Sequence, residues 1–147
     1  GSTFTFNNKT YTLKQFHFHT PSEHTLDGKH APMEMHMVHQ SDDGKLAVVG
    51  ILFKAGKKPN ANLAKVIANM PTVKGESKHL ADAGFDLMFN LPKDNHAYHY
   101  VGSLTTPPCS EGVQWLVLRH PIEVTSDQIQ AFSSVIGPNN RPVQALN

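Results

Sequence analysis

The stretch QFHFHTPSEHTLDGKHAPMEMHMVH, residues 15 to 39, decides the fold that we expect for this chain. It opens with three polar side chains that alternate with two phenylalanines, which places them on one face of a β-strand: Gln15, His17 and His19. Near its end, Glu34 and His36 share one face of a second strand, and methionines occupy the other face. If the two strands pair, directly or through one sheet, His17, His19 and His36 converge on one point.

Three converging histidines are typical of a catalytic zinc site, which takes three protein ligands and leaves a fourth position for water. Gln15 and Glu34 each lie two residues before a histidine on the same strand face, where an oxygen can accept the second ring N–H. Cys109 is the only cysteine, so nitrogen and oxygen must supply the ligands. The sequence therefore predicts a Zn²⁺ site.

A single histidine on a half-buried strand is more often an ordinary core or surface residue than a metal ligand. We apply that interpretation to six histidines taken one by one: His24, His30, His79, His96, His99 and His120. It also applies to His39, which lies on the opposite strand face from His36 and is predicted to be a core residue. The methionines Met33, Met35 and Met37 are interpreted in the same way, as core packing.

The composition is that of one soluble domain spanning residues 1–147. Thirteen Lys and Arg against twelve Asp and Glu give a formal charge of +1, without a basic run, so we expect neither nucleic acid nor a membrane surface as a partner. No apolar run has the length of a membrane-spanning helix. The first two residues, Gly-Ser, resemble a cloning scar, and we expect the native N-terminus to lie elsewhere.

The pattern predicts a mainly β, α+β fold: a twisted, largely antiparallel central sheet with a few short peripheral helices. Residues 4–19 are predicted to form a hairpin that turns at 7–9, followed by a loop over 20–32 with a short extended piece at 23–26. Further strands are expected at 33–39, at 46–54, at 98–102 and in 113–124, the last ending at Pro121. Helices are expected after Asn60 and after Thr125 or Ser126, with a weaker helical signal at 77–81.

Five separated motifs, QFHFH, SEH, MEMHMVH, GSLTTPP and NNRPVQ, resemble those of the α-class carbonic anhydrases of bacterial type, in the same order from Thr10 to Gln144. The resemblance implies hydration of carbon dioxide to bicarbonate by zinc bound to His17, His19 and His36. It also implies inhibition by sulfonamides and anions. It further assigns Gln15, Glu34 and the backbone of Asn139 to orient the three histidines.

By the same resemblance, Thr105 would donate a hydrogen bond to Glu23 and accept one from the zinc-bound hydroxide, and Thr106 would line the mouth of the site. Without the resemblance, Glu23 would be taken for a solvated loop residue. The carbon dioxide pocket would be formed by five apolar side chains: Val38, Val48, Leu104, Val113 and Trp115.

The family domain extends beyond this chain at both ends, so the resemblance implies a truncated domain without the family's histidine proton shuttle. From this we expect zinc binding with weak or buffer-dependent turnover, and a homo-oligomer that can exchange strands. The cysteine that pairs with the position of Cys109 in bacterial and secreted members is also absent, so we expect an unpaired Cys109 and a periplasmic or secreted parent protein. Two other functions remain open: a non-catalytic zinc-binding module of the same fold, and a histidine-rich metal-binding protein.

Overall fold

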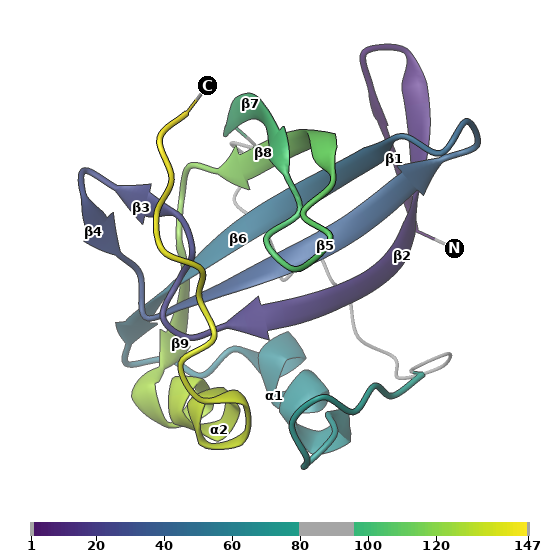
Figure 1. The fold of residues 1–147 in the computed structure, drawn as a ribbon. Helices are drawn as coiled ribbons and strands as arrows, with labels where there is room; N and C mark the ends of the chain where they lie inside the picture. The colour runs from purple at the N-terminus through teal and green to yellow at the C-terminus, as the bar shows by residue number, and fades with distance from the viewer. Residues whose placement is uncertain (1, 80–95, 147) are drawn as a thin grey trace.

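A computed structural model describes residues 2–79 and 96–146 of the chain (Figure 1). The expected helical turn at 77–81 lies partly outside these residues, and 77–79 are not helical. The predicted hairpin is confirmed as β1 (Thr3–Phe6) and β2 (Lys9–His19). Its turn places Asn7 and Asn8 at φ angles of 48° and 58°, in the left-handed region that asparagine tolerates and that two-residue hairpin turns require.

The main sheet has seven strands, of which six follow the order β1-β2-β5-β6-β8-β7. The additional strands are β5 (Met33–Ser41), β6 (Leu46–Gly56), β7 (Ala97–Ser103), β8 (Glu111–Leu118) and β9 (Ile122–Thr125). Neighbours on this path run antiparallel, except that β6 pairs in parallel with β8 along one half and with β9 along the other. The mainly β fold class is therefore confirmed, with a mixed sheet.

The predicted strand that ends at Pro121 corresponds to β8, which already ends at Leu118, and the residues after Pro121 form a second strand, β9, that was not predicted. The chain bends at residues 119 and 120, and Pro121, which has no N–H to donate, separates β8 from β9. The bend lets β9 continue along the second half of β6. The expected loop at 20–32 likewise contains a small hairpin, β3 (Thr25–Leu26) and β4 (Lys29–His30), which turns at Asp27 and Gly28 with positive φ angles.

One face of the sheet carries the main apolar core and is covered by two helices, α1 (Ala61–Asn69) and α2 (Ser126–Ile136) (Figure 1). Its largest buried members are the methionines and phenylalanines Met33, Met35, Phe18, Phe53 and Phe132. His39 is also buried on this face, where its Nδ1–H donates to the Met37 carbonyl at 2.9 Å. The predictions of a methionine core and of a core histidine are confirmed. None of the described helices is long and apolar enough to cross a membrane.

A β-bulge in β2 turns the polar face of the strand toward the site. Leu13 is paired with His39, whereas Gln15 is paired with Val38, so Lys14 is an extra residue in β2. Because paired residues share a sheet face, Leu13 packs on the helix side and Gln15 lies on the other side. The bulge therefore allows Leu13 to face the helices while Gln15 faces the other side of the sheet.

A buried glutamine joins the starts of the two helices. The Asn60 side chain accepts a hydrogen bond from the Leu63 N–H at 2.9 Å and caps α1. Gln128 of α2 accepts from the Asn60 N–H at 2.9 Å and donates to the Asn60 carbonyl at 2.8 Å. Gln128 also completes a capping box with Thr125. Both caps therefore depend on one side chain.

Replacing Gln128 by alanine is expected to lower the free energy of unfolding by roughly 1–3 kcal/mol, because the Asn60 N–H would lose its partner and the Asn60 carbonyl would keep only the Ala64 N–H. Urea unfolding of the metal-free protein measures the change. The matched control is Gln130→Ala in the same helix, whose side chain is not buried. Equal stability of both variants would contradict this role.

Candidate metal centre

The three predicted ligand histidines meet on the sheet face opposite the methionines. His17 of β2 and His36 of β5 are direct cross-strand partners, and His19 is paired with Glu34. The ring centroids of His17 and His36 are 5.3 Å apart, and those of His19 and His36 are 4.6 Å apart. One nitrogen from each of the three rings lies within 4.8 Å of the others. Strand pairing therefore brings together the three side chains that the alternation predicts.

Each histidine uses one ring nitrogen in a hydrogen bond that fixes its orientation. His17 Nδ1 donates to Gln15 Oε1 at 2.8 Å, and His36 Nε2 donates to Glu34 Oε1 at 2.9 Å. His19 Nδ1 donates to the Asn139 carbonyl at 3.1 Å. The side chain of Asn139 is bonded to the Thr20 N–H and the Phe18 carbonyl, which holds this acceptor against the end of β2. The structure thus places all three predicted orienting groups beside their histidines.

The remaining ring nitrogens fit a zinc ion. His19 Nε2 is buried and has no hydrogen-bond partner among the described residues, which is costly for a polar atom without a ligand. Three neutral imidazoles with outer hydrogen-bond acceptors form the donor set of an open catalytic zinc site. His17, His19 and His36 could therefore hold the metal.

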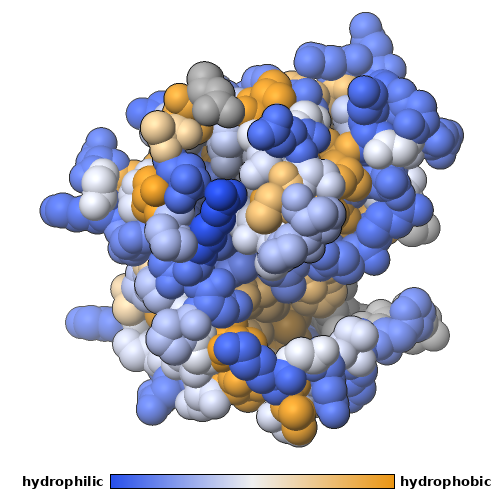
Figure 2. Space-filling view, viewed as in Figure 1, coloured by the Kyte–Doolittle hydropathy of each residue, from blue (hydrophilic) through white to orange (hydrophobic). Residues whose placement is uncertain are grey.

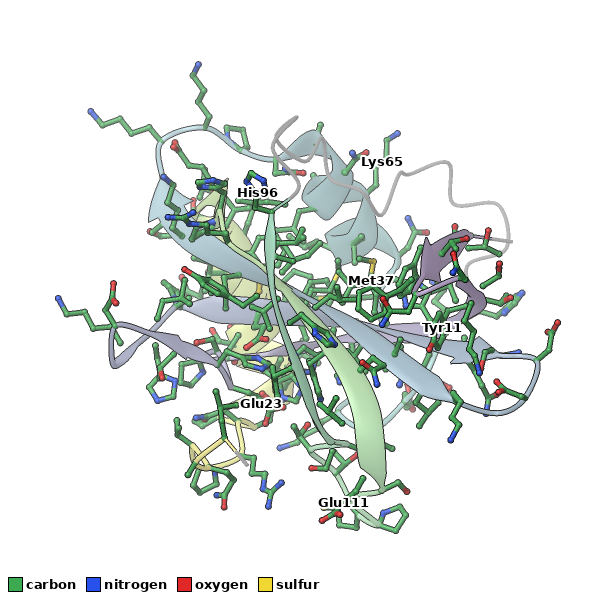
Figure 3. All side chains as sticks on the ribbon, turned by 90° about the horizontal axis from the view of Figure 1, so that it is seen from above. Tyr11, Glu23, Met37, Lys65, His96 and Glu111 are labelled. Atoms are coloured by element: carbon green, nitrogen blue, oxygen red, sulfur yellow. The ribbon has the colours of Figure 1, made fainter. Side chains whose placement is uncertain are left out.

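Glu23 lies at the edge of this centre, between the β3–β4 hairpin and the C-terminal tail (Figure 3). Its Oε2 accepts from the Arg141 N–H at 2.6 Å. Its buried Oε1 lies 3.3 Å from His19 Nε2 but has no hydrogen-bond partner. The expected hydrogen bond from Thr105 is therefore not formed, because the fixed carboxylate directs this oxygen toward the histidines.

The two threonines of the predicted site line different hollows. Thr105 lines one beside Glu23 and His24. Thr106 lines another with His17 and His19, which extends between β2 and the helices. Figure 2 shows apolar side chains in the hollow between the sheet and the helices. Thr106 thus lines a hollow together with two of the three candidate ligands.

Sequence reasoning missed the part of the site that lies behind Glu34. His24 Nδ1 donates to Glu34 Oε1 at 2.5 Å, and His24 Nε2 pairs with the Tyr100 hydroxyl at 2.7 Å. Glu34 Oε2 accepts from the backbone N–H groups of Glu23 and His24, at 2.8 and 2.9 Å. His24 is thus satisfied, as expected of an ordinary histidine, but its partners belong to the site. The motif SEH contained His24, whereas nothing in the sequence pointed to Tyr100.

This environment shifts the pKa values of several groups. Burial, and then the neighbouring His36 and His19, lower the pKa of His17 to about 3. Burial likewise lowers the pKa of His19. Burial alone would raise the pKa of Glu34, but hydrogen bonds from His24 and His36 outweigh it and keep this pKa below its usual range. His17 and His19 are therefore neutral at pH 7, as metal binding requires.

The metal-free protein is expected to lose stability as the pH falls below about 6.5. His17, His19 and His39 have lowered pKa values in the folded state, so the unfolded chain binds more protons in this range. Each contributes a slope of up to about 1.4 kcal/mol per pH unit, and for His17 the loss continues down to about pH 3. Urea unfolding in chelator at pH 7 and pH 5 measures this. An unfolding free energy that is equal or higher at pH 5 would contradict it.

An apolar cluster adjoins the histidines on the same sheet face. It contains the predicted pocket residues Val38, Val48, Val113 and Trp115, with Leu104 packed against them. It also contains Val117, which sequence reasoning missed. The Trp115 ring meets the His36 ring edge to face, with centroids 4.8 Å apart, and its Nε1–H donates to the Ser103 carbonyl at 2.9 Å. A buried apolar surface therefore lies beside the candidate metal centre.

Comparison with known proteins agrees with this geometry. A family model described as eukaryotic-type carbonic anhydrase matches residues 2–147. The carbonic anhydrases of Pectobacterium carotovorum and Neisseria gonorrhoeae are 43% and 45% identical to the whole of this chain, which spans 60% and 58% of their lengths. The chain thus spans about three fifths of these relatives.

Solved structures show the same similarity. The α-carbonic anhydrase of Photobacterium profundum has a TM-score of 0.90 and 46% identity, over 99% of this chain and 66% of that one. The enzyme of Thermovibrio ammonificans, solved with the inhibitor sulfanilamide, has a TM-score of 0.87 and 49% identity, over 96% of this chain and 62% of that one. From its histidine centre, its sheet and these relatives, the chain belongs to the eukaryotic-type, or α, carbonic anhydrase family.

Proposed function

We propose that this chain binds zinc through His17, His19 and His36 and catalyses the reversible hydration of carbon dioxide to bicarbonate and a proton. The observation that carries the proposal is the convergence of three histidine nitrogens, each oriented by its own acceptor, beside a buried apolar wall. When bound, zinc supplies a Lewis acid that lowers the pKa of its water ligand to about 7, the value known for carbonic anhydrase.

The residues of the chain have distinct roles in this proposal. Val48 and Trp115, 1% exposed each, form part of a water-poor surface against which a small apolar molecule such as carbon dioxide can lie. Glu23 keeps one buried carboxylate oxygen without a hydrogen-bond partner, and this oxygen can accept a hydrogen bond from a hydroxyl group. Thr105 lines the same hollow as Glu23.

A carbon dioxide hydration assay on the zinc-loaded protein tests the proposal. Turnover above the buffer background, inhibited by sulfanilamide and absent from His36→Ala, is the expected result. Since Thermovibrio ammonificans carbonic anhydrase was solved with this sulfonamide, we expect the same compound to bind here. Equal rates with and without His36 would overturn the proposed function.

A further inference from the structure

Gly50 lies in the middle of β6, opposite His36 on β5 and beside Val117 on β8. Its φ angle is not in the left-handed region, so the backbone would accept an alanine. A Cβ atom at this position would lie 3.0 Å from Glu34 Oε1 and 3.5 Å from a methyl carbon of Val117. Glycine in a strand interior otherwise weakens the strand, so the close approach of another group accounts for it here.

The carboxylate that would meet this Cβ cannot move away without losing hydrogen bonds. Glu34 Oε1 accepts from His24 at 2.5 Å and from His36 at 2.9 Å, and Oε2 accepts from two backbone N–H groups. The Glu34 side chain is fully buried. On the other side, Val117 leaves the new methyl group little room to retreat. A methyl group at residue 50 must therefore displace Glu34 or separate the strands.

We propose that Gly50 is a positioning residue of the metal centre. The absence of a side chain lets Glu34 Oε1 lie against the β6 backbone, and this position sets the direction of the His36 ring. The His36 nitrogen that is not bonded to Glu34 is thereby aimed at His17 and His19. This inference rests on the proposed zinc site and adds to it a residue that touches neither metal nor substrate.

Gly56, at the end of the same strand, provides a matched control. A Cβ atom there would lie 2.1 Å from Cγ of Glu123, a flexible and exposed side chain that accepts from the Lys57 N–H. Gly56→Ala therefore also introduces a steric conflict into β6. It has no connection to the histidines through the hydrogen bonds described above.

Zinc dissociation into a chelator, measured for the whole chain, tests the proposal. Gly50→Ala is expected to release zinc about 10-fold faster than the unchanged protein, at the lower end of the effect of losing an outer hydrogen-bond partner. Gly56→Ala is expected to leave this rate unchanged. In a Glu34→Ala background, where the methyl group meets no carboxylate, Gly50→Ala is expected to have no further effect. An unchanged rate in Gly50→Ala, or an equal acceleration with and without Glu34, would overturn the proposal.

A metal-free readout separates this inference from the zinc proposal itself. In the apoprotein, the proton of His36 Nε2 hydrogen-bonded to Glu34 is an imidazole N–H that proton NMR can detect. Gly50→Ala should shift or abolish this resonance, and Gly56→Ala should leave it in place. Failure of the unchanged protein to bind zinc would overturn the proposed function, whereas the NMR result would still decide the role of Gly50.

Whether the variants fold provides a second test of the role of Gly50. If Gly50→Ala alone does not fold, a folded Gly50→Ala/Glu34→Ala double variant identifies Glu34 as the obstacle and supports the proposal. An unfolded double variant, with Glu34→Ala alone folded, would contradict it.

Discussion

Replacing His36 by alanine is expected to lower zinc affinity by more than about 100-fold and to remove carbon dioxide hydration. His36 is the ligand that joins β5 to the two histidines of β2. Loss of an outer partner alone costs roughly 10–100-fold, so loss of a direct ligand should cost more. Chelator competition measures the affinity.

The matched control for this change is His39→Ala. Both histidines are buried in β5, at 1% and 5% exposure, so both variants lose a ring from the protein interior. His39 lies on the helix side of the sheet, against Phe4, and does not reach the metal centre. We expect His39→Ala to lose stability and keep its zinc affinity. A similar loss of affinity in both variants would argue that zinc responds only to the stability of the fold.

Replacing Glu34 by glutamine is expected to lower zinc affinity by roughly 10–100-fold, although the side chain keeps its shape. The oxygen at Oε2 must remain to accept the two backbone N–H groups, so the amide NH₂ would take the place of Oε1. There it would donate to His36 Nε2, and the proton of a neutral His36 would move to Nδ1. The protonated nitrogen would then face the metal.

Nitrogen-15 NMR of the apoprotein reports this change of tautomer directly, and chelator competition gives the affinity. Glu123→Gln is the control, because Glu123 is an exposed carboxylate on β9. The prediction fails if Glu34→Gln keeps the His36 proton on Nε2 and binds zinc as tightly as the unchanged protein.

The sequence predicted the metal centre because its parts are local. His17 and His19, like Glu34 and His36, follow the two-residue period of a strand, and the chain between the two strands is short. The pairing that brings them together is the simplest one available to consecutive antiparallel strands. The helix caps Asn60 and Thr125 were predictable for the same reason, since a cap acts within one turn.

What the sequence did not reveal depends on distant segments. Tyr100 reaches His24 from β7, and the Arg141 N–H binds one oxygen of Glu23, whose other oxygen has no partner among the described residues. The division of 113–124 into β8 and β9 follows from their parallel pairing with different halves of β6. Figure 3 shows the start of β7, near His96, and the start of β8, at Glu111, at opposite ends of this antiparallel pair.

Self-association and a periplasmic or secreted location stay predictions. In the described part of the chain, β1, β7 and β9 each pair with only one neighbouring strand, and free edges can pair with another chain.

The position of β6 at the centre of the sheet also leads us to expect a particular order of folding. Strands β2, β5 and β6 follow one another closely, whereas β8 and β9 reach β6 from more than 60 residues further along the chain. Closing such long loops is slow compared with forming a meander of neighbouring strands. The three histidines lie in the early meander, and Trp115 and Asn139 arrive with the late segments. We therefore expect the strands that carry the histidines to pair before the apolar cluster beside them is complete.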